Sequence, residues 1–276
     1  MRTMISAWAI CALLLAGLPV AAQENPASSV KALKDLSYGP DERNLLDLYL
    51  PESAGAPRPL LVCIHGGGWA GGGKDRYKWL AEAFARKGFV AASITYRFAP
   101  KWRSPAAMDD VQRAVRWLRA NADKHGIDPA RVGAIGGSAG GHLASYLALA
   151  EPHPIDDPAL AAHSPRVQAV VDCYGPVDFV GMMSSASAPI VEAFVGKPLQ
   201  GNEEAYRRAS PVSYVKPTPP PFLIVHGTAD VGTKRGQVPM EQSKDFHEKL
   251  KAAGGDATLL VLEDAPHGFS TRADSP

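Results

Sequence analysis

This 276-residue sequence has few cysteines, almost no net charge and no basic tract. It contains three cysteines and carries a formal net charge of +1. With 46% hydrophobic and 21% charged residues, its composition is that of an ordinary globular protein with a sizeable core. Because no basic tract or aromatic-interleaved patch is present, neither nucleic acid nor an anionic membrane is an expected partner.

Metal-binding and phosphate-binding patterns are also missing. No pair of His or Cys residues has the spacing of metal ligands, so the sequence predicts no metal site and no cofactor. Residues 71–73 are a glycine cluster, but Lys74 and Asp75 follow it. A phosphate-binding loop would instead end in Gly-Lys-Ser/Thr.

The sequence has one long apolar run, at its N-terminus. Arg2 precedes the apolar residues 5–18, and the small residues 20–22 then form a cleavage site of the signal-peptidase type. A membrane anchor is the alternative, but a span needs about 20 apolar residues. We therefore predict a signal peptide at 1–22, a mature domain at 23–276, a secreted or periplasmic location and no membrane association after cleavage.

The segment 136–140 reads Gly-Gly-Ser-Ala-Gly, a G-x-S-x-G pattern with Ser138 at its centre. An apolar run comes before it and a helix-forming run comes after it. A serine on such a strand-to-helix turn takes a strained backbone that exposes its hydroxyl, and flanking glycines let the strand and helix approach closely. The pattern indicates a nucleophilic serine.

Several buried-strand candidates end in polar or glycine-rich loops, which supply a serine, an acid and a histidine in that order. The runs are 60–64, 132–135, 222–225 and 258–262. Ser138, Asp230 and His267 follow three of them. This order is that of α/β-hydrolases and differs from that of chymotrypsin and subtilisin. We predict Ser138 as nucleophile, His267 as base and Asp230 as the orienting acid.

Other residues compete for two of these roles. Asp178 also follows a strand end and is the rival acid, although it opens a predicted cap and could serve as a helix cap. Among the eight histidines, His142 is expected to be structural, and His226 is expected to hold the loop that carries Asp230.

The loop His65-Gly66-Gly67-Gly68 supplies candidate oxyanion donors. Backbone N–H groups aimed at the developing oxyanion contribute about 10²–10³ in rate per donor. We predict an oxyanion hole made by Gly67, Gly68 and Ala139. Trp69 is expected to bind substrate as a wall of the acyl or alcohol pocket, the alternative being a plain core aromatic.

Strand and helix signals alternate from residue 60 onward, which predicts a mostly parallel sheet with helices on both faces. The irregular stretch at about 179–211 lies where a small cap would interrupt this alternation. The fold class is therefore α/β, with the α/β-hydrolase arrangement.

These motifs resemble the α/β-hydrolase superfamily and, within it, bacterial carboxylesterases with an HGGG oxyanion loop. The resemblance implies that the mostly parallel sheet has eight strands. The resemblance spans residues 35–270. The segments 96–100, 105–109 and 136–142 are similar to hormone-sensitive-lipase-like enzymes and to feruloyl/acetyl-xylan esterase-like proteins, and the short leader favours the latter.

The resemblance implies a secreted serine carboxylesterase that hydrolyses short-chain or aryl esters, of acetyl or feruloyl type, through an acyl-enzyme. Its partner would be a small-molecule or polysaccharide-linked ester. A prolyl-oligopeptidase-like peptidase and a non-catalytic binding protein on the same fold are the alternatives. An N-terminal region of propeller length is missing, which argues against the first, and the complete set of triad and oxyanion residues argues against the second.

The sequence departs from these relatives in two places. Residues 231–237 form a seven-residue loop where relatives have about three residues, which can reshape the acyl site. The chain ends nine residues after His267, where the fold normally closes with a helix. Whether the chain is truncated there is left open by the sequence.

With the usual hydrolase strand order, Cys63 and Cys173 lie on strands separated by the nucleophile strand. Their backbones would then be about 9.6 Å apart, given strands about 4.8 Å apart. A disulfide needs Cα atoms within about 7 Å. We therefore expect two buried thiols without a disulfide, even in an oxidising compartment.

Overall fold

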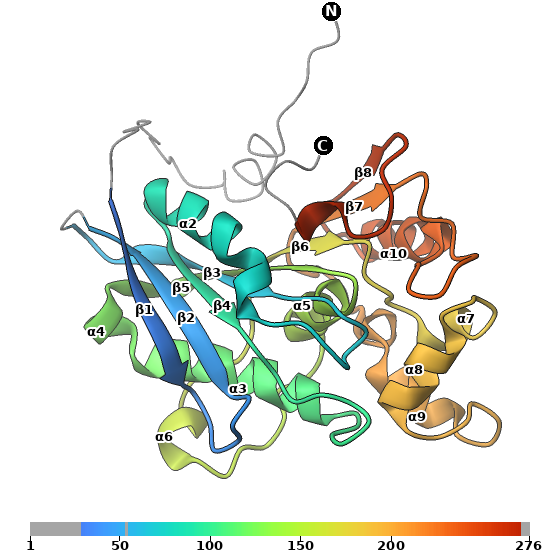
Figure 1. Ribbon diagram of the computed structural model, residues 1–276, viewed down its shortest axis with the longest axis horizontal. Coiled ribbons are helices and arrows are strands. Elements are labelled where there is room, and N and C mark those ends of the chain that lie inside the picture. The colour runs from blue at the N-terminus through green and yellow to red at the C-terminus, as the bar shows by residue number, and fades with distance from the viewer. Residues whose placement is uncertain (1–28, 53–54, 272–276) are drawn as a thin grey trace, which may run out of the picture.

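The computed structural model describes residues 29–52 and 55–271, and a sheet of eight strands forms its frame (Figure 1). The predicted signal peptide at 1–22 lies outside the described residues. The strands are β1 Val30–Ser37, β2 Leu45–Pro51, β3 Arg58–Ile64, β4 Val90–Ile94, β5 Ile127–Gly137, β6 Ala169–Cys173, β7 Phe222–Gly227 and β8 Ala257–Leu262.

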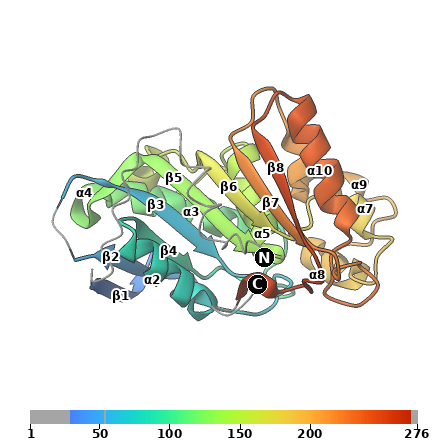
Figure 2. The same ribbon diagram turned by 90° about the horizontal axis from the view of Figure 1, so that it is seen from above.

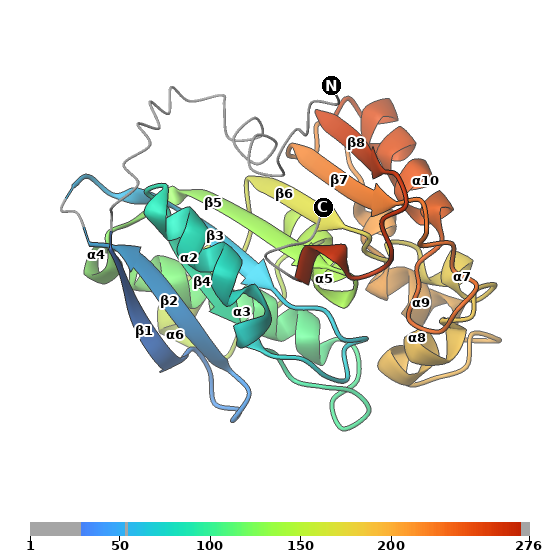
Figure 3. The same cartoon turned by 45° about the horizontal axis from the view of Figure 1, so that its top comes forward.

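All eight strands belong to one sheet, in the order β1-β2-β4-β3-β5-β6-β7-β8. Antiparallel pairing joins β1 to β2 and β2 to β4, and the remaining pairs are parallel. The predicted mostly parallel, eight-stranded α/β-hydrolase sheet is therefore confirmed. Figure 3 shows how strongly the sheet twists between β1 and β8, as the right-handed twist of each strand requires.

Helices cover both faces of the sheet. The longer helices are α2 Lys78–Arg86, α3 Ala106–Ala120, α5 Ala139–Leu149 and α10 Met240–Ala252, and the short α4 Ala122–His125 and α6 Pro158–Ala161 lie beside them. Seen from above, α2 lies on one face, and α3, α5 and α10 lie on the other (Figure 2). The short turns η1 Lys74–Tyr77 and η3 Phe269–Thr271 complete the α2 side.

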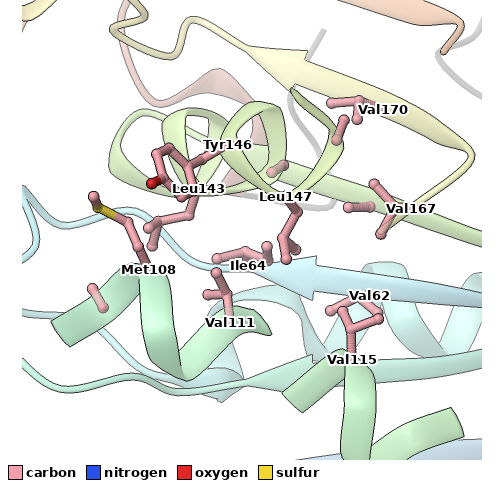
Figure 4. Packing of buried hydrophobic residues seen from close by; sticks show 14 of the residues in the cluster. Val62, Ile64, Met108, Val111, Val115, Leu143, Tyr146, Leu147, Val167 and Val170 are labelled. Atoms are coloured by element: carbon pink, nitrogen blue, oxygen red, sulfur yellow. The ribbon is translucent and has the colours of Figure 1, made fainter. Parts of the chain in front are cut away.

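The alternation of side chains along the strands divides the core into two layers. In β3, Val62 and Ile64 belong to the cluster under α3 and α5, whereas Leu61 and Cys63 belong to the cluster under α2. The first layer is shown in Figure 4, where Val111 of α3 and Leu147 of α5 reach the sheet from either side of Ile64. Strands buried on both faces explain the continuous apolar runs of the sequence.

The predicted cap region at 179–211 contains three short helices and leads into a fourth helical turn. These are α7 Phe179–Met182, α8 Ala188–Val195, α9 Glu203–Ala209 and η2 Pro211–Tyr214. They follow β6 and lie beside the carboxyl end of the sheet (Figure 1). Within the described part of the chain, the helices are too short or too polar to cross a bilayer.

The two cysteines of the sheet are not joined. Cys63 lies on β3 and Cys173 on β6, with β5 between them, and both are buried without a disulfide. The expectation of two unbridged thiols is confirmed, because the strand order keeps their backbones too far apart.

Candidate active site

The chain reverses its direction of winding between β3 and β5, where open α/β sheets place their ligand crevice. From β3 the chain passes to β4, and after β5 it proceeds to the other side through β6, β7 and β8. The loops that follow β3, β5, β7 and β8 carry the residues singled out by sequence. Parallel pairing brings these strand ends to one edge of the sheet.

Ser138 lies on the tight turn between β5 and α5. Its backbone has φ 57° and ψ −124°, a strained conformation for a residue with a side chain. The glycines around it are required by close packing, since a Cβ at Gly140 would lie 2.0 Å from the carbonyl oxygen of Ile64. The Ser138 N–H donates to the carbonyl of Cys173 at 2.9 Å. Neighbouring strands thus hold the strained turn in place.

A hydrogen-bonded relay links three side chains that are far apart in sequence. The Ser138 Oγ lies 2.9 Å from His267 Nε2, and His267 Nδ1 lies 2.6 Å from Asp230 Oδ2. A carboxylate can only accept, so the ring proton lies on Nδ1. Nε2 is then available to accept the proton of the Ser138 hydroxyl. This is the geometry of a serine nucleophile with an oriented base.

The carboxylate of Asp230 is held on several sides. It is 1% exposed, and its Oδ1 accepts the N–H of Val238 at 2.9 Å. His226 Nε2 lies 3.4 Å from Oδ2 and 3.1 Å from the Val238 carbonyl. His226 Nδ1 contacts the Ser243 hydroxyl at 2.7 Å, and burial lowers the His226 pKa. As expected from the sequence, His226 contacts the acid and its loop.

Asp178, the rival acid, has a different environment. Its Oδ1 accepts the N–H of Val180 at 3.0 Å and caps the start of α7. His267 is paired with Asp230, and no contact between His267 and Asp178 is found in the described residues. A short polar side chain at a helix N-cap satisfies one of the free backbone donors there. Asp178 is therefore a helix cap in this structure.

The glycine loop after β3 curves toward Ser138. Gly67 has φ +125° and Gly68 has φ +59°, and both line the pocket around the serine. Within the described residues, no hydrogen bond uses the N–H of Gly67, Gly68 or Ala139. These donors are available to an oxyanion, as the prediction for this loop requires. The N–H of Ala139 lies at the first position of α5, the positive end of the helix dipole.

Trp69 lies deeper than the sequence suggested. It borders the pocket, but its side chain is only 2% exposed. Its indole N–H donates to His142 Nδ1 at 3.1 Å, and its ring stacks on Phe194 of α8 with centroids 4.5 Å apart. Trp69 is thus a largely buried aromatic at the border of the pocket, and its predicted contact with substrate stays a proposal.

His142 belongs to the same cluster and is structural, as predicted. Its Nε2 lies 2.7 Å from the carbonyl of Ala209, and its Nδ1 accepts from Trp69. Burial lowers the His142 pKa to about 4, so the ring is neutral. Both nitrogens are satisfied, and neither reaches the relay.

The pocket around Ser138 has a volume of about 430 Å³. The cap supplies part of its apolar wall through Met182, Ile190 and Val191, and Pro176 adds to it. No group of three or more His, Cys, Asp or Glu side chains suited to a metal is found in the part of the chain that the structure describes. The size is that of a small-molecule site.

Sequence reasoning missed several residues of this pocket. Tyr174 packs against His267 with ring centroids 4.7 Å apart, and its hydroxyl lies 2.5 Å from that of Ser270. Arg76 and Arg235 also line the pocket. The position of Tyr174 directly after β6 was a usable signal, since this strand end neighbours the nucleophile strand. Arg76 lies on the short turn η1 and Arg235 in the loop 231–237, and neither segment has a periodic pattern that would reveal them.

Comparison with curated proteins finds esterases and a formamidase, all longer than this chain. Esterase LipQ of Mycobacterium tuberculosis is 35% identical over 247 residues, covering 87% of this chain and 58% of that protein. Kynurenine formamidase of Danio rerio is 27% identical over 245 residues, covering 88% of this chain and 77% of that protein. The chain spans less than two thirds of the length of the mycobacterial relatives.

Solved structures of esterases share the fold. A truncated carbohydrate esterase from gut microbiota has a TM-score of 0.75 at 27% identity, covering 89% of this chain and 92% of that one. A propionate-bound esterase, Est2 of Thermogutta terrifontis, has a TM-score of 0.70 at 29% identity, covering 88% of this chain and 86% of that one.

The family model named BD-FAE matches residues 46–250. This range contains the glycine loop, Ser138 and Asp230 but ends before His267. It covers most of the chain, and the sheet has the order and direction found above. The chain therefore belongs to the BD-FAE family and has the α/β-hydrolase fold.

Proposed function

We propose that this protein is a serine carboxylesterase that hydrolyses short-chain or aryl esters, of acetyl or feruloyl type, through an acyl-enzyme. The observation that carries the proposal is the relay from Ser138 through His267 to Asp230, on a strained turn that faces a glycine loop. The esterases among the relatives and structural neighbours support the same reaction class.

In this proposal, Ser138 Oγ attacks the ester carbonyl while His267 Nε2 takes its proton. The negative charge on the carbonyl oxygen is stabilised by the N–H groups of Gly67, Gly68 and Ala139. His267 then protonates the departing alcohol, and Asp230 stabilises the imidazolium throughout. A water molecule, activated by the same histidine, hydrolyses the acyl-Ser138 bond.

The size of the pocket supports small acyl groups. A methylene group contributes about 0.8 kcal/mol only where a pocket buries it. A site of about 430 Å³ must hold both the acyl and the alcohol part. Est2, a structural neighbour with this fold, is a propionate-bound esterase, which is consistent with a small acyl group.

The test is hydrolysis of 4-nitrophenyl esters of increasing chain length, with methyl ferulate and acetylated xylan added. We expect kcat/KM to peak between acetyl and butyryl. A peak at decanoyl or longer esters would instead indicate a lipase with a lid at 181–211.

The Ser138→Ala variant is the matched control for this panel. Its kcat should fall by a factor on the order of 10⁶, since members of a triad act as a unit. Labelling by a fluorophosphonate should fail as well. If the variant retained a tenth of the activity, Ser138 would not be the nucleophile.

Export is a separate proposal that rests on the N-terminal sequence. Cleavage after Ala22 would leave Gln23 as the first residue of the mature protein. Mass spectrometry of the protein recovered from periplasm or medium tests this. Recovery of an uncleaved chain from the cytoplasm would exclude export.

A further inference from the structure

The walls of the pocket around Ser138 lack negative charge. Among the described residues, no aspartate or glutamate lines it, and apart from His267 its ionisable cationic side chains are Arg76 and Arg235. The relay acid Asp230 is 1% exposed, and both of its oxygens are engaged. A ligand in this pocket therefore faces two guanidinium groups and no opposing carboxylate.

The position of Arg76 is fixed by its neighbours on η1. Lys74 Nζ forms an ion pair with Asp47 Oδ1 at 2.9 Å, and the buried Tyr77 places its hydroxyl 3.1 Å from that of Ser270. The short turn that carries Arg76 is thus anchored on both sides. The Arg76 side chain itself is exposed at the pocket.

Arg235 belongs to the long loop 231–237, which is tied to the cap. The Ser187 hydroxyl accepts the N–H of Gly236 at 3.0 Å and donates to the carbonyl of Gln237 at 2.7 Å. These bonds order the backbone on the carboxyl side of Arg235. The loop 231–237 therefore brings a cationic side chain to the active-site pocket.

Within the part of the chain that the structure describes, neither guanidinium group has a hydrogen-bond or ion-pair partner. In the described ranges, no ion pair or side-chain hydrogen bond involves Arg76 or Arg235, even though Asp75 is adjacent to the first. Other arginines of the chain do pair, such as Arg97 with Asp110 at 2.8 Å. Two unpaired arginines that face one pocket indicate a ligand with negative charge.

We propose that this esterase is specific for esters that also carry a carboxylate, and that Arg76 and Arg235 bind this group. This inference rests on the proposed function. Guanidinium groups bind carboxylates in a bidentate manner, through parallel N–H···O bonds. With the ester carbonyl at Ser138, a carboxylate on the acyl or the alcohol part would lie against the pocket walls that carry the two arginines.

Two pairs of nearly isosteric substrates test the proposal on the whole protein. Monomethyl succinate and methyl succinamate differ in a carboxylate on the acyl side, whereas 4-acetoxybenzoate and 4-acetoxybenzamide differ on the alcohol side. The measured quantity is the ratio of kcat/KM for the charged ester to that for the neutral ester. Comparing this ratio between variants cancels the intrinsic reactivity of each ester.

Arg76→Gln and Arg235→Gln should each lower the ratio for at least one pair by about two- to fivefold, the range for an exposed ion pair. In the wild type, 0.5 M NaCl should lower the same ratio, because salt screens exposed charges. Arg207→Gln removes an exposed arginine from α9, away from the pocket lining, and should leave the ratio unchanged.

The outcomes separate this proposal from the proposed function. If the wild type hydrolyses the neutral esters but neither arginine variant changes either ratio, the carboxylate specificity is wrong and the esterase activity stands. An equal change in Arg207→Gln would also overturn it, since the effect would come from net charge alone. If the wild type hydrolyses none of the four esters, the proposed esterase function is wrong, and the carboxylate specificity that rests on it is wrong as well.

Discussion

The two candidate acids differ at the level of single contacts. Asp230 contacts His267 at 2.6 Å and is almost completely buried, whereas Asp178 accepts a backbone N–H at the start of α7. Asp230→Asn should lower kcat by about 10⁴ with little change in KM, because the imidazole loses its orienting charge. Steady-state kinetics on 4-nitrophenyl butyrate measures this.

Asp178→Asn is the control variant for Asp230→Asn, because it makes the same change at the rival acid. An asparagine can still cap α7, so this variant should keep most of its activity. If Asp178→Asn were the inactive variant, the assignment of the acid would be wrong. The loop that follows Asp230 would then serve only its contacts with the cap.

Asp172 is a buried carboxyl group beneath the nucleophile helix. It is 1% exposed and accepts hydrogen bonds from the Ser145 hydroxyl at 2.7 Å and the Gly175 N–H at 2.8 Å. Burial nevertheless raises its pKa from 3.8 to about 6. As the pH falls, Asp172 is therefore protonated at a higher pH in the native protein than in the unfolded chain.

The sign of the pH effect follows from that shift. Asp172 contributes its full stabilisation below about pH 4, and this is lost as the pH rises through about 6. Two pKa units correspond to on the order of 2–3 kcal/mol. Asp172→Asn should remove this dependence, so the variant gains stability relative to wild type between pH 4.5 and pH 7.5.

Urea unfolding at the two pH values measures the difference. Asp245→Asn, at an exposed position on α10, is the control and should behave like wild type. A constant difference between Asp172→Asn and wild type across this range would contradict the prediction.

At the scale of elements, an aromatic cluster joins the glycine loop, α5 and the cap. Trp69 stacks on Phe194 of α8, and His142 of α5 stacks on Phe179 of α7 with centroids 4.7 Å apart. The carbonyl of Ala209, at the end of α9, completes the cluster through His142. The position of the cap relative to Ser138 therefore depends on Trp69.

Trp69→Ala should flatten the acyl chain-length profile more than it lowers the overall rate. Removing a buried side chain that borders the pocket leaves space for longer acyl chains. Truncation of a buried tryptophan also costs about 3–5 kcal/mol of stability, so the profile is measured where thermal unfolding shows the variant to be folded.

Trp69→Phe separates packing from hydrogen bonding. It keeps an aromatic ring against Phe194 and loses the N–H that reaches His142. This variant should keep the wild-type chain-length preference. A uniform fall in rate for Trp69→Ala, with the same preferred chain length, would show that Trp69 does not shape the pocket.

At the scale of the whole molecule, four loops that are separated in sequence meet because their strands run parallel. The loops after β3, β5, β7 and β8 all emerge at the carboxyl edge of the sheet. In the relay, His267 contacts Ser138, 129 residues away in sequence, and Asp230, 37 residues away. Such contacts exist only when the register of every intervening strand is in place.

The sequence by itself determined the fold class, the turn around Ser138 and the glycine loop, because these depend on local rules. Glycines are needed where backbones approach, and buried parallel strands read as short apolar runs. It also supplied the candidates Asp230 and His267, through their order and their place after strands. The pairing of Cys63 and Cys173 could be excluded from strand order alone.

Only the tertiary structure decided which of these residues meet. It brought His267 to Asp230 instead of Asp178 and buried Trp69 at the border of the pocket. It also placed Arg76 and Arg235 in the lining of that one pocket. These contacts join loops that are distant in sequence. Loop conformation does not produce a periodic pattern in the sequence, so it could not be predicted. Their geometry is set by the packing of the whole sheet and cap, which no local pattern encodes.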